Sequence, residues 1–122
     1  MKKKKIVIQR NYLEKIPARP DHISWETYED GRVTLSIENN GWTNRIAQKF
    51  FGRPKVSYVH LDEMGSFIWP LLDGDKNIIE LGKLVDSHFG EKAHPLYERL
   101  ARYFQIMDSY HFILWKQVEK ER

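Results

Sequence analysis

The hydrophobic residues change their spacing partway along the chain, and this change limits the fold more than any other feature. Over residues 23–38 and 55–61, apolar and polar residues alternate, whereas beyond residue 61 the apolar residues recur every three or four positions. Alternation is typical of a strand with one buried face, and the longer period is typical of an amphipathic helix. The sequence therefore predicts an α+β fold in which strands precede helices.

Three segments show the strand pattern: residues 23–29, 32–38 and 55–61. Asp30 and Gly31 separate the first two, and both residue types tolerate the positive φ that a tight two-residue turn requires. We therefore expect a β-hairpin and a third strand, which together form a three-stranded antiparallel sheet. Between the second and third strands, apolar residues at helical spacing predict a short helix over residues 42–51.

Three helices are predicted in the second half of the chain. The first covers residues 64–72, with Asp62 as its cap. Asn77 and Glu80 have the spacing of a capping box for the second helix, and Pro95 suits the first turn of the third. A sheet of three strands followed by three helices is close to a winged helix-turn-helix arrangement.

The length and composition fit one domain with short tails. We expect an extended arm over residues 1–22, the domain over residues 23–115 with a terminal strand at 111–115, and a tail over residues 116–122. The chain has no cysteine, which excludes disulfides and thiolate metal sites. No run approaches the roughly 20 apolar residues of a membrane-spanning helix. These features predict a cytoplasmic protein without a membrane partner.

An ordered set of short motifs lies in the second half. The motifs are Leu-Asp-Glu-Met-Gly-Ser-Phe-Ile-Trp at residues 61–69, Leu-Asp-Gly at 72–74, Ile-Ile-Glu-Leu at 78–81 and Phe-Gly at 89–90. In this order they resemble the core of the PqqD-like family, which is named for pyrroloquinoline quinone biosynthesis protein D. The resemblance covers about residues 23–115, and the segment 42–54 is longer than the loop of a minimal member.

The resemblance implies a peptide-binding adaptor that is not itself an enzyme. Such a RiPP recognition element binds the leader of a ribosomally made precursor peptide and presents it to a modifying enzyme, often a radical S-adenosylmethionine enzyme. The leader lies as an added strand beside the third strand, and the third helix forms the other wall. Carried over to this chain, the peptide-binding residues are Lys55, Val56, Ser57, Tyr58, Val59, Tyr97, Leu100, Ala101, Phe104 and Met107.

Charge is concentrated in two places. The formal net charge of +3 comes from Lys2 to Lys5, because without them sixteen basic residues stand against seventeen acidic ones. A second basic segment lies beside the expected peptide-binding strand and contains no acid: Arg45, Lys49, Arg53 and Lys55. We expect these four side chains to favour a leader that carries acidic residues.

Other functions have weaker support in the sequence. A DNA-binding winged-helix regulator is the main alternative, but the third helix balances Arg99 and Arg102 with Glu98 and Asp108, so it offers little excess charge for phosphates. Pairing of the same strand edge with a second copy would give a homodimer. The five histidines lack the spacing of zinc ligands, and no nucleophile or phosphate-binding motif is present. We therefore expect no metal, no cofactor and no catalytic residue.

Overall fold

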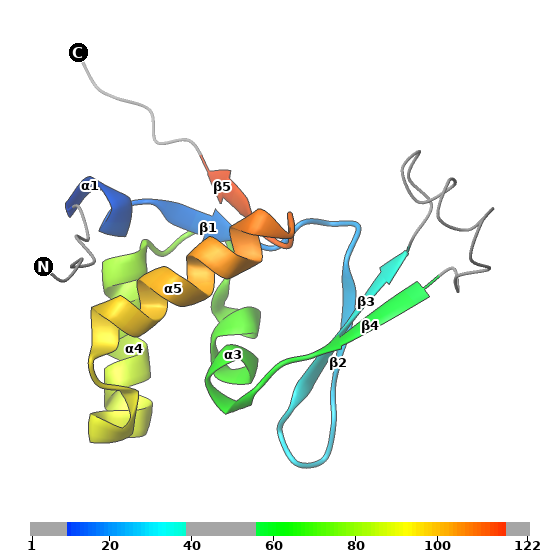
Figure 1. Cartoon of the computed structure of the whole chain (residues 1–122), viewed down its shortest axis with the longest axis horizontal. Coiled ribbons are helices and arrows are strands. Elements are labelled where there is room, and N and C mark those ends of the chain that lie inside the picture. Colours follow the sequence, from blue (N-terminus) through cyan, green and yellow to red (C-terminus); the bar gives the residue numbers. More distant parts are fainter. Residues whose placement is uncertain (1–9, 39–55, 117–122) are drawn as a thin grey trace, which may run out of the picture. The chain divides into compact units, whose positions relative to one another are not determined.

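The structure is a computed structural model that describes residues 10–38 and 56–116 (Figure 1). Its contacts divide the chain into two compact units, and the boundary falls inside one helix. The sheet unit comprises residues 21–66, and the helical unit comprises residues 1–20 and 67–122. The predicted helix over residues 42–51 lies outside the described residues.

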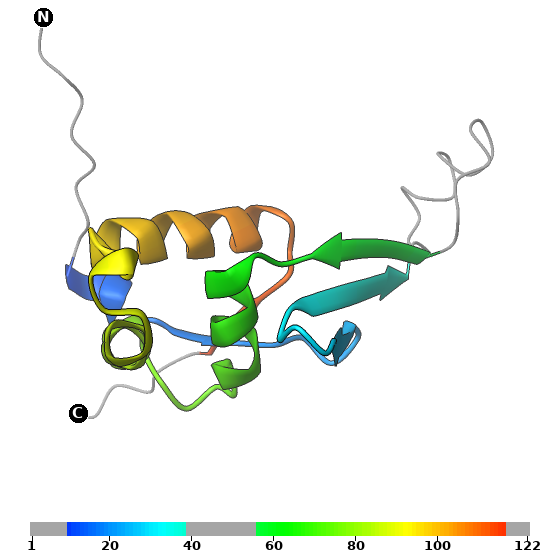
Figure 2. The same cartoon turned by 90° about the horizontal axis from the view of Figure 1, so that it is seen from below.

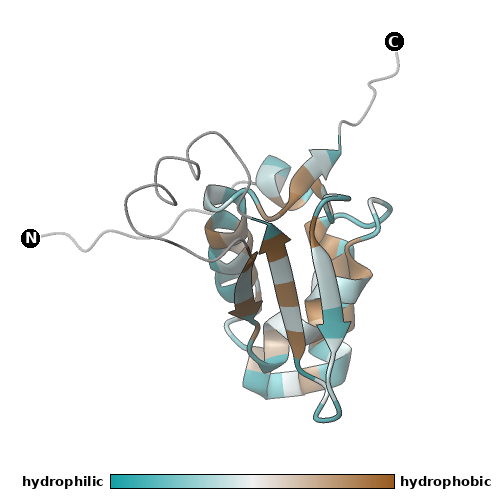
Figure 3. Cartoon of the chain, turned by 90° about the vertical axis from the view of Figure 1, so that its right-hand side faces the viewer, coloured by the Kyte–Doolittle hydropathy of each residue, from teal (hydrophilic) through white to brown (hydrophobic). Residues whose placement is uncertain are grey.

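The sheet unit contains an antiparallel sheet of three strands in the order β2-β3-β4. The strands are β2 (Ser24–Thr27), β3 (Val33–Glu38) and β4 (Val56–His60). Leu35 lies opposite Trp25 on one side and Val59 on the other, so these three side chains share one face of the sheet. Figure 3 shows hydrophobic and polar residues alternating along the central strand. The predicted three-stranded antiparallel sheet is thus confirmed.

The loop between β2 and β3 is longer than predicted. Tyr28 and Arg32 still pair through their main chains, and the Gly31 N–H donates to the Tyr28 carbonyl over 2.9 Å. Three residues rather than two therefore close the hairpin, as a β-turn followed by Gly31 at φ +86°. Asp30 accepts a hydrogen bond from the Arg32 N–H over 3.0 Å, so its side chain stabilises the longer loop.

The helices are α3 (Glu63–Ile68), α4 (Ile78–Phe89) and α5 (Leu96–Ser109). A short 3-10 helix, η1 (Trp69–Leu71), continues α3 through Pro70, and another, η2 (Gly90–Ala93), connects α4 to α5. Figure 2 views α4 nearly end-on while α5 runs across the picture, so the two helices cross steeply. The predicted order of three strands followed by three helices is confirmed.

Side chains within a few positions of the helix starts satisfy exposed N–H groups. Asp62 accepts from the Gly65 N–H over 2.8 Å. Asn77 and Glu80 form the predicted capping box, in which each side chain accepts from the other residue's N–H over 2.8 Å. These local sequence signals therefore mark the starts of α3 and α4 correctly.

The first described residues are more structured than an extended arm. Residues 10–13 form the short helix α1 (Arg10–Leu13), and β1 (Ile16–Ala18) pairs antiparallel with β5 (Leu114–Lys116). Arg19 then donates from its guanidinium to the carbonyls of Trp69 and Pro70, over 3.2 and 2.8 Å. A positive charge near the carbonyls that end a helix is favourable. Through these contacts the segment packs as part of the helical unit.

The core residues of the two units follow the predicted apolar patterns. In the sheet unit, the buried hydrophobic residues are Ile23, Val33, Leu35, Leu61 and Met64. In the helical unit, they include Ile68, Trp69, Leu72, Ile78, Leu81, Val85, Leu100, Phe104, Met107 and Ile113. None of the helices in the described ranges is long and apolar enough to span a membrane.

Candidate functional site

Strand β4 has one side paired with β3, and no other described strand pairs with its second side. The Leu61 N–H donates to the Val33 carbonyl over 2.9 Å, which shows that the main-chain groups of Leu61 face β3. Because these groups alternate along a strand, Ser57 and Val59 also face β3. The N–H and C=O groups of Val56, Tyr58 and His60 are therefore directed to the open side.

The end of β4 is held by the hydroxyl of Ser66. The Val33 N–H donates to Ser66 Oγ over 2.8 Å, and Ser66 Oγ donates in turn to the Leu61 carbonyl over 3.3 Å. Ser66 is only 6% exposed, so its hydroxyl replaces a direct ladder bond inside the sheet unit. This bridge ties β3 and β4 to the first turn of α3 and stabilises the position of the open edge.

The five residues predicted on this strand differ in whether the structure describes them and in how exposed their side chains are. Lys55 lies outside the described residues. Val56, Ser57 and Val59 are partly buried, whereas the side chain of Tyr58 is 64% exposed. The structure therefore places four of the predicted residues on one continuous strand whose edge is open, and it leaves one large aromatic ring beside that edge.

The residues predicted on the third helix are less accessible. Leu100, Ala101, Phe104 and Met107 are at most 5% exposed and belong to the packed interior. Tyr97 lies against α4, where its hydroxyl donates to the Ile79 carbonyl over 3.4 Å. These positions have a clear packing role, and their contact with a peptide stays a prediction.

A different set of apolar side chains near the end of α5 is exposed. Ile106 is 49% exposed and Tyr110 is 63% exposed, and Leu114 at the start of β5 is 55% exposed. Tyr110 stacks on Phe112 with ring centroids 5.4 Å apart. Ile106 and Tyr110 recur at helical spacing with the buried residues Leu100, Phe104 and Met107, and such spacing alone does not show which apolar residues of a helix are buried.

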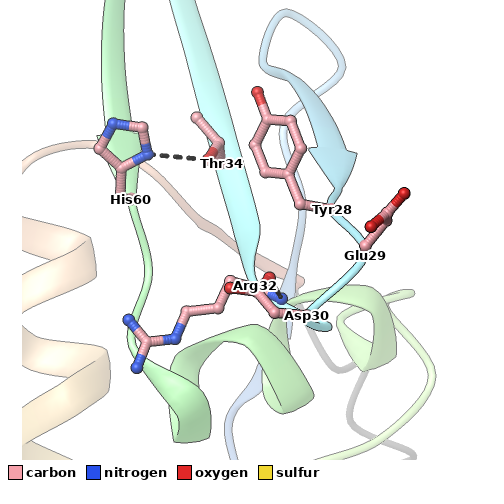
Figure 4. A pocket seen from close by; sticks show the side chains of 6 residues that line it. All are labelled: Tyr28, Glu29, Asp30, Arg32, Thr34 and His60. Atoms are coloured by element: carbon pink, nitrogen blue, oxygen red, sulfur yellow. Dashed lines mark hydrogen bonds between the residues drawn. The ribbon is translucent and has the colours of Figure 1, made fainter.

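The outer face of the sheet carries a polar hollow that the sequence analysis missed. It is open to solvent, has a volume of about 460 Å³ and is lined by Glu26, Tyr28, Thr34, Ser36, Tyr58 and His60. Thr34 and His60, which line both this hollow and the adjoining depression drawn in Figure 4, share a hydrogen bond of 2.8 Å between Oγ1 and Nδ1. The alternation of the strands already placed these residues opposite the core, but only the register of all three strands brings them together.

Two side chains in the helical unit have shifted pKa values. Burial, with a smaller effect of the Asp108 charge, raises the pKa of Tyr12. A hydrogen bond from Lys76, 2.9 Å long, lowers the pKa of the exposed Asp73 carboxyl. Both groups have structural causes for their shifts, and neither lines the polar hollow of the sheet.

The remaining predictions about the site concern charge and metals. The basic residues Arg45, Lys49 and Arg53 lie outside the described residues. Within residues 10–38 and 56–116, no three His, Asp or Glu side chains are grouped so that they could hold a metal ion. His94 and Asp86 form an exposed pair 2.7 Å apart, and this pair has no third ligand within that part of the chain.

One protein-family model matches the sequence. The model, described as coenzyme PQQ synthesis protein D (PqqD), matches residues 33–113. No curated protein and no solved structure gives a significant match. The matched range starts with β3 and includes β4, all three principal helices and the motifs on which the resemblance was based. The chain therefore belongs to the PqqD family.

Proposed function

We propose that this protein is an adaptor that binds the leader of a ribosomally made precursor peptide and presents it to a modifying enzyme. The leader adds as a strand to the open edge of β4. The chemistry belongs to the partner enzyme, for which a radical S-adenosylmethionine enzyme is the candidate, and the adaptor itself needs no cofactor. Family membership supports the general role, and the edge of β4 is the observation that carries the mode of binding.

The open edge suits an extended peptide for a simple physical reason. Val56, Tyr58 and His60 direct N–H and C=O groups outward at every second position, which matches the spacing of the corresponding groups in another strand. Ordering a flexible leader costs about 2–5 kcal/mol, so main-chain hydrogen bonds alone give only modest affinity. Side-chain contacts must supply the rest.

We further propose the sources of those side-chain contacts. Tyr58 supplies an exposed aromatic ring on the edge strand itself. By analogy with the family, the third helix supplies the second wall. The basic segment with Arg45, Lys49, Arg53 and Lys55 favours acidic residues in the leader. The steep crossing of α4 and α5 is compatible with the helix-turn-helix part of a winged-helix fold, which we infer for the whole domain.

A proline substitution tests strand addition directly. Tyr58→Pro removes one outward N–H without removing a hydrogen bond to β3, and proline is tolerated on an edge strand. Tyr58→Ala is the matched control, because it removes the same ring but keeps the N–H. We expect calorimetric titration with the small peptides encoded beside the gene to show binding about 3–10-fold weaker for the proline variant than for the alanine variant.

The result that would overturn strand addition is equally specific. If Tyr58→Pro stays folded, as judged by circular dichroism, and binds the peptide as tightly as Tyr58→Ala, the peptide does not use this edge. A titration with mixed duplex DNA at low and moderate salt is run in parallel, since tight binding that weakens steeply with salt would favour the regulator instead. Size-exclusion chromatography at several concentrations detects self-pairing of the edge.

A further inference from the structure

The polar hollow on the outer face of the sheet is distinct in chemistry from the edge of β4. Its walls are side chains from all three strands, and its two tyrosines, Tyr28 and Tyr58, are 52% and 64% exposed. Glu26 lies in the cross-strand row with Thr34 and His60, between the rows that carry the two tyrosines. The hollow therefore combines two accessible aromatic rings with a carboxylate in the same depression.

The charge around the hollow is mainly negative. Glu26 lines it, and two acids, Glu29 and Asp30, line the adjoining depression together with one base, Arg32. Within the described part of the chain, neither Glu26 nor Glu29 has a hydrogen-bonded or ionic partner. Arg32 is the basic residue nearest in sequence, and Figure 4 shows its guanidinium extending away from Tyr28. Among the described residues that line the hollow itself, none is a lysine or an arginine, so the Glu26 carboxylate is not paired with a basic side chain there.

We propose that this hollow binds arginine or lysine side chains on the surface of a second protein partner. The face of a tyrosine ring attracts a cation, and a nearby carboxylate adds a charge-assisted hydrogen bond. A volume of about 460 Å³ is large for a single ion and suits a long side chain entering from an open surface. Tyr58 and His60 belong both to β4 and to the hollow, whereas Glu26 and Tyr28 lie outside the proposed leader contacts, so the test uses those two residues.

The test compares two short acetylated Gly-Ser peptides that differ only in charge. One carries two arginines, and the other carries citrulline, the uncharged isostere, at both positions. In ¹⁵N-¹H NMR spectra of the full chain, the arginine peptide is expected to shift the amides of Glu26, Thr34, Ser36 and His60, and the citrulline peptide is not. Added salt should weaken the effect, because exposed charges are screened.

Substitutions then assign the binding to the hollow. We expect Glu26→Gln and Tyr28→Ala each to weaken binding of the arginine peptide by about threefold, since each removes one exposed interaction. Glu91→Gln removes an exposed carboxylate elsewhere and should bind like the unmodified protein. Titration of the leader peptide into Glu26→Gln should give the original affinity.

Three outcomes would overturn the proposal. The citrulline peptide binding as well as the arginine peptide would show that charge is not recognised. Unchanged binding in both hollow variants, with the protein folded, would place the cation elsewhere. Loss of leader binding in Glu26→Gln together with loss of arginine binding would show that the hollow is part of the leader site and not a second surface.

Discussion

The helical unit and the sheet unit satisfy their polar groups in different ways. In the helical unit, Asn77 and Glu80 cap the start of α4, and Arg19 donates to the carbonyls that end η1. In the sheet unit, one row of main-chain groups on β4 has no partner strand in the described ranges, and two tyrosine side chains are more than half exposed. The comparison shows that the open row of main-chain groups lies in the sheet unit.

The difference also separates two kinds of aromatic residue. Phe104 is fully buried and lies with its ring 5.0 Å from that of Tyr103 and 6.2 Å from that of Trp115. Tyr58 has the opposite environment, because most of its ring contacts solvent. A buried ring contributes mainly to stability, and an exposed ring on a strand edge is available to a ligand.

The largest effect is expected from exchanging these two aromatic residues for alanine. Phe104→Ala should lower the free energy of unfolding by about 3–5 kcal/mol, because it leaves a cavity in the core. Tyr58→Ala should change it by about 0.5 kcal/mol or less, as is usual for an exposed side chain. Urea denaturation measures both values, and similar costs for the two variants would contradict the distinction between a buried ring and an exposed one.

A smaller effect on the free energy of unfolding is expected at Ser66, whose hydroxyl in α3 bonds the main chains of Val33 and Leu61. Ser66→Ala leaves the buried Val33 N–H without its partner, so the free energy of unfolding should fall by about 1–3 kcal/mol. Hydrogen exchange of the Val33 amide should become faster in this variant. Ser87→Ala on the exposed side of α4 is the control, and an equally slow Val33 amide in Ser66→Ala would show that the bridge is dispensable.

The smallest effect is expected at the capping box of α4. Asn77→Ala removes the acceptor for the Glu80 N–H, and this loss should reduce the free energy of unfolding by about 1 kcal/mol. Asn77→Asp keeps a capping oxygen and should remain within a few tenths of a kcal/mol of the original protein. Equal losses in both variants by thermal denaturation would mean that the helix start is stabilised by something other than the cap.

The fold was predictable from the sequence wherever neighbouring residues decide the structure. The Asp62 cap, the box of Asn77 and Glu80, and the break after Phe89 all depend on residues within a few positions of each other. The hairpin was located correctly at Asp30 and Gly31, but its loop has three residues. The loop length depends on which strand residues pair, and turn chemistry alone does not specify that register.

The site was predictable only in part. The alternation over residues 55–61 located β4, whereas the use of its edge, which the family resemblance implies, stays a proposal. The family resemblance also placed Leu100 and Phe104 at the peptide. The structure buries both side chains, and their contact with a peptide stays a prediction. Helical spacing alone does not distinguish these buried residues from the exposed Ile106 and Tyr110.

The sequence by itself determined the order of the three sheet strands and the three principal helices, the caps of α3 and α4, and the family, since periodicity, short-range hydrogen bonds and ordered motifs are properties of the chain alone. Tertiary structure decided which main-chain groups of β4 remain open, how Ser66 closes the ladder, and how Glu26, Tyr28 and Tyr58 come to line one hollow. These features bring together residues that lie far apart in the sequence, such as Val33 and Ser66, and their positions depend on strand register and packing rather than on local preference.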